Sequence, residues 1–341
     1  GVYYVDPNLR TPYIYQYNLS LQRQIARDLV LEANYVGSSS HKLTGLVDSN
    51  PTIIGKTSRL FSTQPGAVDS NYSYLDTFAN VGKAHYNSLE ASLQKRYSSM
   101  KFMGNTMFQL SYTYSHSIDN GSGFRESTSR VPYYNHNQFL ASSDFDLRHN
   151  LVFSGIWDLP FDHAWQSGPK RLTQGWSIRP IISYRTGFPL DITQGISRTR
   201  TRTGPSGAGD PNLVRANLLT ASVTEFDPHV SQSLRNRQGN YYFDPADFGR
   251  FADISTTNYG NYGSLGRNAF YGPGRVNADF TVAKNTQIAE RANLEFRADF
   301  FNALNHTEFS NPSTSFTSGT FGQISTTADP RIIQLALHLT F

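Results

Sequence analysis

The sequence predicts an all-β protein, an antiparallel transmembrane β-barrel to which this chain contributes about nine strands. Three observations predict it. Apolar and polar residues alternate with a period of two along much of the chain. The chain is 13% aromatic but only 16% charged, whereas soluble domains carry about 25% charged residues. The charges also gather on one face of the alternating segments. A sheet with one face in lipid and the other in water has these properties.

Composition argues against several other classes of protein. No run approaches the roughly 20 apolar residues that a transmembrane helix needs. Cysteine is absent, which excludes disulfide scaffolds, thiol nucleophiles and cysteine-type zinc sites. The net charge of +4, without a long basic run, gives nucleic-acid binding little support. On composition alone, a soluble β-sandwich remains an equal alternative.

Nine segments show the alternation, and each has one apolar face. In chain order the apolar faces are Tyr13, Tyr15, Tyr17, Leu19, Leu21; Leu29, Leu31, Ala33, Tyr35; Leu89, Ala91, Leu93; Phe102, Phe108, Leu110, Tyr112, Tyr114; Phe145, Leu147, Leu151, Phe153, Trp157; Trp176, Ile178, Ile182, Tyr184, Phe188; Val276, Ala278, Phe280, Val282; Ala292, Leu294, Phe296, Ala298, Phe300; and Ile333, Leu335, Leu337, Leu339, Phe341. Most segments reach the roughly 9–11 residues that a tilted membrane strand needs. Globular strands are usually about 5–6 residues long, so strand length favours the membrane.

Charge placement separates the two alternatives further. The polar faces carry Glu32, Glu90, Arg96, Asp146, Arg148, Asp158, Arg179, Arg185, Asp279, Glu295, Arg297 and Asp299. The apolar faces carry only Arg23, Lys95 and Lys284, each close to a predicted short turn where a long side chain reaches the headgroups. A charge in the middle of the lipid face costs about 2–4 kcal/mol, and less near the interface. His149 also falls on the apolar face, where we expect it to be neutral.

The predicted connections alternate between short and long. Short links lie at 27–28, 98–101 and 286–291, with a medium link at 160–175; long links lie at 38–84, 116–144, 190–275 and 305–330. Bacterial outer-membrane barrels have short periplasmic turns and long extracellular loops. We therefore expect the last strand to end in the periplasm and the first to start outside. A complete barrel has an even strand count, so we expect further strands to precede residue 1. Residues 40–48 are the place where a strand could be merged with its neighbour.

The chain resembles the C-terminal barrel of TonB-dependent outer-membrane receptors. The likeness is to the Oar-like group, whose N-terminus carries a carboxypeptidase-regulatory-like domain. The segments that carry it, in order, are 17–23, 33–38, 86–90, 111–117, 242–245, 272–274, 296–306 and 334–341. Each is weak alone, but together and in this order they are specific, and they span essentially the whole chain.

The resemblance implies a barrel of about 22 strands with a plugged lumen. Residues 1–341 would be its C-terminal portion, without the plug and N-terminal domains. Its function would be uptake of an unidentified substrate across the outer membrane of a Gram-negative bacterium. The expected partners are membrane lipid, the barrel-assembly machinery, and the TonB complex, which acts through the N-terminal part. The terminal residues Leu335, Leu337, Leu339 and Phe341 would form the barrel-assembly signal.

The charged residues predicted to face the lumen or the plug are Arg148, Arg179, Arg185, Glu295, Arg297 and Asp299. We expect them to pair with one another or with the plug rather than touch substrate. Two other functions remain open: an outer-membrane adhesin or protein-export barrel, and a soluble β-sandwich binding module.

No enzyme is expected. The nine histidines form no metal-binding spacing, so no metal or other cofactor is predicted. Asp144 and Asp146 are better explained as a solvated strand entrance than as an acid–base pair. The glycine-rich run at 204–209 lacks the strand-to-helix setting of a phosphate loop, and no Gly-x-Ser-x-Gly elbow occurs.

Overall fold

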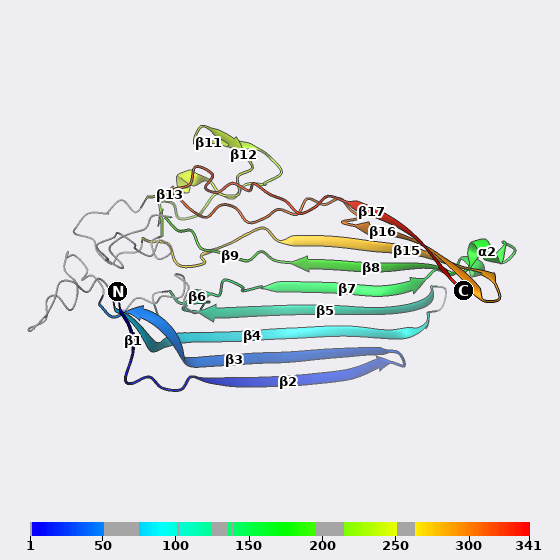
Figure 1. The fold of residues 1–341 in the computed structure, drawn as a ribbon, viewed down its shortest axis with the longest axis horizontal. Coiled ribbons are helices and arrows are strands. Elements are labelled where there is room, and N and C mark those ends of the chain that lie inside the picture. The colour runs from blue at the N-terminus through cyan, green and yellow to red at the C-terminus, as the bar shows by residue number, and fades with distance from the viewer. Residues whose placement is uncertain are drawn as a thin grey trace, which may run out of the picture.

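The computed structural model describes residues 2–50, 75–100, 103–123, 136–137, 139–194, 215–250 and 263–341. Within these residues, nine strands of nine residues or more form one antiparallel sheet (Figure 1). In sheet order they are β17 (Ile332–Thr340), β16 (Ala292–Phe301), β15 (Arg275–Ala289), β8 (Trp176–Arg185), β7 (His149–Asp158), β5 (Gly104–Asp119), β4 (Leu75–Met100), β3 (Leu29–Asp48) and β2 (Tyr13–Ala26). The predicted count of nine is confirmed. The long strands lie in one sheet, so the β-sandwich alternative is wrong.

The short elements lie at the two ends of this sheet. Strand β1 (Val2–Val5) pairs in parallel with β4, and β6 (Ala141–Ser142) pairs with β5. The link after β7 contains the one-turn helices α1 (Phe161–Ala164) and α2 (Lys170–Thr173). The link after β8 contains β9 (Pro189–Leu190), β10 (Asn217–Leu218), β11 (Gln232–Leu234), β12 (Arg237–Gly239), the 3₁₀ turn η3 (Pro245–Asp247), β13 (Phe248–Gly249) and β14 (Phe270–Tyr271). None of the described helices is long and apolar enough to cross a membrane.

The two ends of the sheet differ as the link lengths predict. The C-terminus lies at the end that holds the short connections and α2, which we name the short-turn end (Figure 1). Strand β2 starts at the opposite end, the long-loop end, where the N-terminus also lies (Figure 1). The last strand therefore ends, and the first strand starts, at the ends of the sheet that the link lengths predict.

Several predicted boundaries are wrong. Residues 40–48 continue β3, and 75–84 begin β4, although both were expected in a loop. The two strands stay paired there through register shifts at Ser40–Leu43 and Leu43–Gly45, which interrupt the alternation. Phe145 and Leu147 precede β7 and Phe188 follows β8, while Phe102 lies outside the described residues.

Cross-strand register makes the apolar residues one continuous face. Leu31 pairs with Leu93, Leu93 with Leu110, Leu110 with Phe153, and Phe153 with Ile182. A second row of paired residues runs through Pro180, Phe280, Phe300 and Ile333. Because neighbouring strands share their facing residues, the period-two pattern of each strand becomes a single apolar surface. We call it the apolar face, and the opposite side the polar face.

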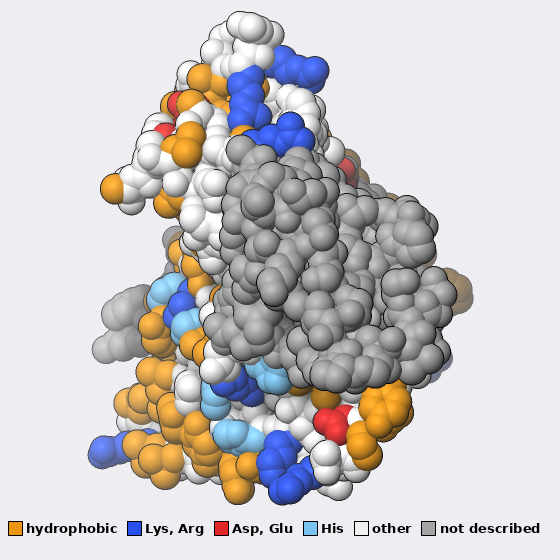
Figure 2. Space-filling view, turned by 90° about the vertical axis from the view of Figure 1, so that its left-hand side faces the viewer, with side chains coloured by type: hydrophobic (Ala, Val, Ile, Leu, Met, Phe, Trp, Pro, Cys, Tyr) orange, Lys and Arg blue, Asp and Glu red, His pale blue; other side chains and the backbone are white. Residues whose placement is uncertain are grey.

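Aromatic residues gather on the apolar face toward the long-loop end. Tyr13 stacks on His41, and the tyrosines at 112 and 114 enclose His149. The Tyr112 hydroxyl lies 2.8 Å from Nδ1 of His149, which gives this imidazole a polar partner. Figure 2 looks onto the long-loop end and shows hydrophobic side chains gathered at its lower left, with histidines among them. Aromatic girdles of this kind mark the edges of a barrel's apolar band.

The two lysines of the apolar face end at the short turns. Lys95 donates to the carbonyl of Thr106 at 3.1 Å and pairs with Asp28 at 3.0 Å. The Ser98 hydroxyl and Lys95 together hold the pKa of Asp28 below its usual range. Lys284 donates to the carbonyl of Gln174 at 2.6 Å. Each ammonium is thus solvated by backbone at the edge of the sheet, as predicted for charges that cannot stay in the middle of the face.

A tyrosine pair satisfies the amide of Asn87 on the apolar face. The hydroxyl of Tyr17 donates to Asn87 Oδ1 at 3.1 Å, and that of Tyr35 donates to the same oxygen at 2.8 Å. Gly37 is needed beside them, because a Cβ there would collide with the Tyr17 ring. The three strands β2, β3 and β4 are therefore tied together by one polar group.

Removing both hydroxyls in a Tyr17→Phe, Tyr35→Phe double variant is expected to lower the free energy of unfolding by about 1–3 kcal/mol, because the Asn87 oxygen loses its donors. Adding Asn87→Leu should recover most of the loss. The measurement is urea unfolding of the full-length protein in phospholipid vesicles. Tyr15→Phe, on the same strand, is the control and should have no effect; an equal loss there would contradict the assignment.

Candidate functional site

The charged residues predicted for the polar face make local pairs. Arg179 Nη2 on β8 lies 3.4 Å from Glu295 Oε1 on β16. Arg297 Nε lies 2.9 Å from Asp299 Oδ2, two residues along the same strand. Asp299 also accepts a hydrogen bond of 2.6 Å from the Thr281 hydroxyl on β15. These contacts lie between residues of the predicted set and their neighbours, so the strands hold their own charges in place.

Arg148 and Arg185 lie nearer the long-loop end. Arg148 precedes β7, and its Nε lies 3.1 Å from Asp146 Oδ2. The Tyr271 hydroxyl is 3.3 Å from the same Nε, so β14 is held against this rim. Arg185 ends β8 and places its guanidinium over the ring of Phe188, 4.5 Å from the centroid.

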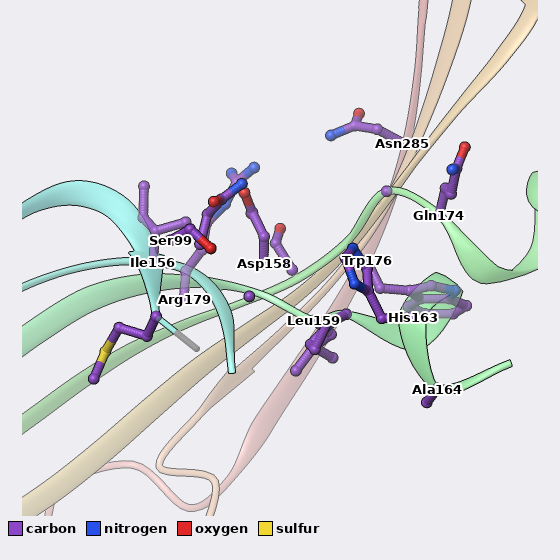
Figure 3. A pocket seen from close by; sticks show the side chains of 16 residues that line it. Ser99, Ile156, Asp158, Leu159, His163, Ala164, Gln174, Trp176, Arg179 and Asn285 are labelled. Carbon is purple, nitrogen blue, oxygen red and sulfur yellow. The ribbon is translucent and has the colours of Figure 1, made fainter. Parts of the chain in front are cut away.

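A cavity of about 800 Å³ opens at the short-turn end of the sheet. Ser99, Asp158 and Arg179 lie on one side of it, and His163 of α1 and Trp176 on the other (Figure 3). The Nε of Arg179 is buried there without a hydrogen-bond partner among the described residues. This cavity therefore offers a guanidinium N–H donor between walls that are partly polar and partly apolar.

The links at the long-loop end fold into a layer with its own core. We define this loop layer as the described residues 186–194, 215–250, 263–274 and 302–331. Its buried core consists of Leu190, Ile192, Ala216, Phe243, Phe248, Leu265, Phe316 and Phe321. The core joins the link between β8 and β15 to the link between β16 and β17 (Figure 1). Burial raises the pKa of Tyr242, packed against this core, to about 12, and Glu225 adds to the shift. The layer is therefore a packed structure rather than a set of independent loops.

Arg267 anchors the loop layer to the rim of the sheet. Its side chain is 2% exposed. Nη2 donates to Asp119 Oδ1 at 2.7 Å, to Ser122 Oγ at 2.7 Å and to Asp144 Oδ1 at 3.1 Å. Nη1 donates to the carbonyls of Asp119 and Phe139 at 2.9 and 3.0 Å. Because Asp119 is the last residue of β5, this arginine fixes the layer directly to a membrane strand.

Sequence reasoning missed Arg267 and the other residues that organise this end. Asp119 and Arg275 continue the period-two alternation of β5 and β15. That alternation could have assigned both residues to the polar face. Arg267 and Glu308 lie in links without periodicity, so no local signal could have found them.

The two aspartates considered as an acid–base pair have separate partners. Asp144 Oδ1 accepts from Arg267 and from Asn268. Asp146 Oδ1 accepts from the backbone N–H of Ser117 at 2.6 Å. Among the described residues, no cluster of three or more His, Asp or Glu side chains is arranged to hold a metal ion. The glycine-rich run at 204–209 lies outside the described residues.

The residues predicted to form the assembly signal share one side of the edge strand β17. Leu335 and Leu337 are 70% and 68% exposed. They pair with Ala298 and Phe296 across the sheet, and Leu339 pairs with Leu294. Phe341 follows the strand and is 95% exposed. All four extend the apolar face to the short-turn end.

The comparison with protein families agrees with the fold. The family described as outer membrane beta barrel domain matches residues 1–334. A search of curated proteins finds no significant match. Among solved structures, the chain is similar to the outer membrane transporter YddB from Escherichia coli, with a TM-score of 0.48 and 14% identity. That match covers 98% of this chain and 33% of YddB, so the chain spans about a third of that protein's length.

Proposed function

The chain belongs to the outer membrane beta-barrel domain family, and from that premise we propose that it is the C-terminal barrel portion of a TonB-dependent receptor. It lies in the outer membrane of a Gram-negative bacterium, with its apolar face against lipid. The proposed function is uptake of a substrate through a plugged lumen, energised through the TonB complex. The chain performs no catalysis in this proposal.

One observation carries the proposal. The described sheet is open, since β2 and β17 are its two edges and do not pair with each other. An open edge in lipid leaves backbone N–H and C=O groups unsatisfied, at several kcal/mol each. We therefore infer that further strands complete the barrel. Barrels well beyond nine strands enclose a wide lumen, and those of about 22 strands are plugged transporters.

The polar face supports a lumen that holds a protein plug. Several of its charges are neutralised by neighbours, as in the pairs Arg179–Glu295 and Arg297–Asp299. The free Nε of Arg179 beside the cavity at the short-turn end is a donor available to a plug segment. The barrel-assembly machinery would read Leu335, Leu337, Leu339 and Phe341, which stand free on an edge strand.

Binding to TonB tests the proposal. The full-length protein, purified from outer membranes in detergent, is expected to bind the purified periplasmic domain of TonB saturably in biolayer interferometry. A porin of the same preparation is the control. Heat-modifiable migration on gels verifies that the barrel is folded. A folded protein that does not bind TonB would overturn energised uptake.

An adhesin or protein-export barrel would then take its place.

A further inference from the structure

A second, smaller cavity lies on the polar face directly under the loop layer. Its volume is about 280 Å³. Arg185 at the end of β8 and Arg275 at the start of β15 line it from the sheet. Phe188, Glu308 and residues 309–311 line it from the loop layer. Both sheet residues belong to the polar face, so the cavity opens toward the proposed lumen.

The two arginines are direct cross-strand neighbours. Arg275 pairs with Arg185 in the register of β15 and β8. Like charges in directly opposed positions repel each other. Arg185 contacts the ring of Phe188 and forms no hydrogen bond or ion pair within the described part of the chain. Its five N–H donors are therefore available to a ligand.

Glu308 lies beside Arg275 and only partly balances the charge of the two arginines. Its side chain is 4% exposed. Oε1 accepts from the backbone N–H of Val276 at 2.9 Å and lies 2.8 Å from His306 Nδ1. Oε2 is 3.6 Å from Arg275 Nε, which is too long for a hydrogen bond, and it has no other partner among the described residues. A buried carboxylate oxygen without a hydrogen-bond donor is costly. As far as the structure describes the chain, Oε2 of Glu308 therefore lacks a donor, and Arg185 lacks an anion.

We propose that this cavity binds a small hydroxylated carboxylate of the sugar-acid class, as a substrate subsite on the path into the lumen. The ligand's carboxylate accepts a bidentate pair of hydrogen bonds from Arg185, the geometry that a guanidinium favours. A ligand hydroxyl donates to Oε2 of Glu308. The side chains of Ser310, Asn311 and Thr327 line the same cavity and receive further hydroxyls. This inference rests on the proposed transport function.

The volume limits the size of the ligand. Pockets for drug-sized molecules are about 300–1,000 Å³, so this cavity of about 280 Å³ suits one sugar ring rather than a large chelate or an oligosaccharide.

Calorimetric titration of the full-length, detergent-purified protein tests the assignment, with sodium glucuronate as probe. We expect saturable binding that weakens at least tenfold in Arg185→Gln and in Arg275→Gln. Arg250→Gln, an exposed arginine of the loop layer, is the matched control and should bind as the unaltered protein does. Glucose, which lacks the carboxylate, should not bind at tenfold the concentration. In Glu308→Gln, the preference for glucuronate over acetate should fall, because the hydroxyl acceptor is weakened.

Each outcome decides one point. Equal binding of glucose and glucuronate, or full affinity in Arg185→Gln, would overturn the carboxylate assignment. Equal binding of sulfate and glucuronate would overturn the hydroxyl recognition. Heat-modifiable migration of every variant verifies folding. TonB binding, measured on the same samples, separates failure of this inference from failure of the transport function.

Discussion

Replacing Arg267 by methionine is expected to release the loop layer from the sheet while leaving the membrane strands folded. The variant leaves the carboxylate of Asp119 buried without its ion-pair partner. Breaking a buried ion pair on one side costs about 3–5 kcal/mol. The cost falls on the layer, because the strands keep their backbone pairing. Arg267→Lys should be nearly as harmful, since one ammonium cannot replace a planar guanidinium that donates from two nitrogens.

Limited proteolysis of intact cells measures this release. When opening is fast, cleavage follows the population of the open state, so a loss of about 3 kcal/mol predicts roughly 100-fold faster cleavage within the loop layer. Arg250→Met, exposed in the same layer, should leave the rate unchanged. Unchanged cleavage in Arg267→Met would show that the hydrophobic core alone holds the layer in place.

Placing arginine at Leu335 is expected to prevent stable insertion of β17. Leu335 stands on the apolar face opposite Ala298 and is 70% exposed, which in the membrane means exposure to lipid. Arginine in the middle of that face costs about 2–4 kcal/mol. Its neighbours along the face, Ile333 and Leu337, offer no carboxylate to offset the charge. The matched variant is Gln334→Arg on the polar face, opposite Asp299, where the new charge meets an acidic partner.

The heat-modifiable fraction in purified outer membranes measures the outcome. Leu335→Arg should reduce the folded fraction several-fold, whereas Gln334→Arg should leave it unchanged. Equal losses in the two variants would mean that β17 does not present its odd-numbered residues to lipid. Normal folding of Leu335→Arg would mean that another part of the protein covers this face.

Local sequence determined the nine strands and the two faces of the sheet. Successive side chains of a strand point to opposite sides. The apolar positions of a segment such as 292–300 therefore identify the side that faces lipid. The same rule placed Arg179, Glu295, Arg297 and Asp299 together on the polar face, and it required no knowledge of the neighbouring strands. Link lengths alone gave the direction of the first and last strands.

Only the tertiary structure decided the strand pairing and the packing of the links at the long-loop end. The extension of β3 through residues 40–48 depends on its pairing with 75–84, and register shifts hide that pairing from the alternation. The loop-layer core brings Leu190, Phe243 and Phe316 together from two separate links. The described strands of these links are at most three residues long, so no period in the sequence marks these residues as buried.

The contacts of the charged residues Arg267 and Glu308 could not be predicted from local sequence either. Arg267 meets Asp119 across 148 positions of sequence, and Glu308 meets the N–H of Val276 across 32. The role of each is set by partners that only folding brings near. A strand pattern records which side a residue faces, but the contacts of an irregular link depend on where distant segments come to lie.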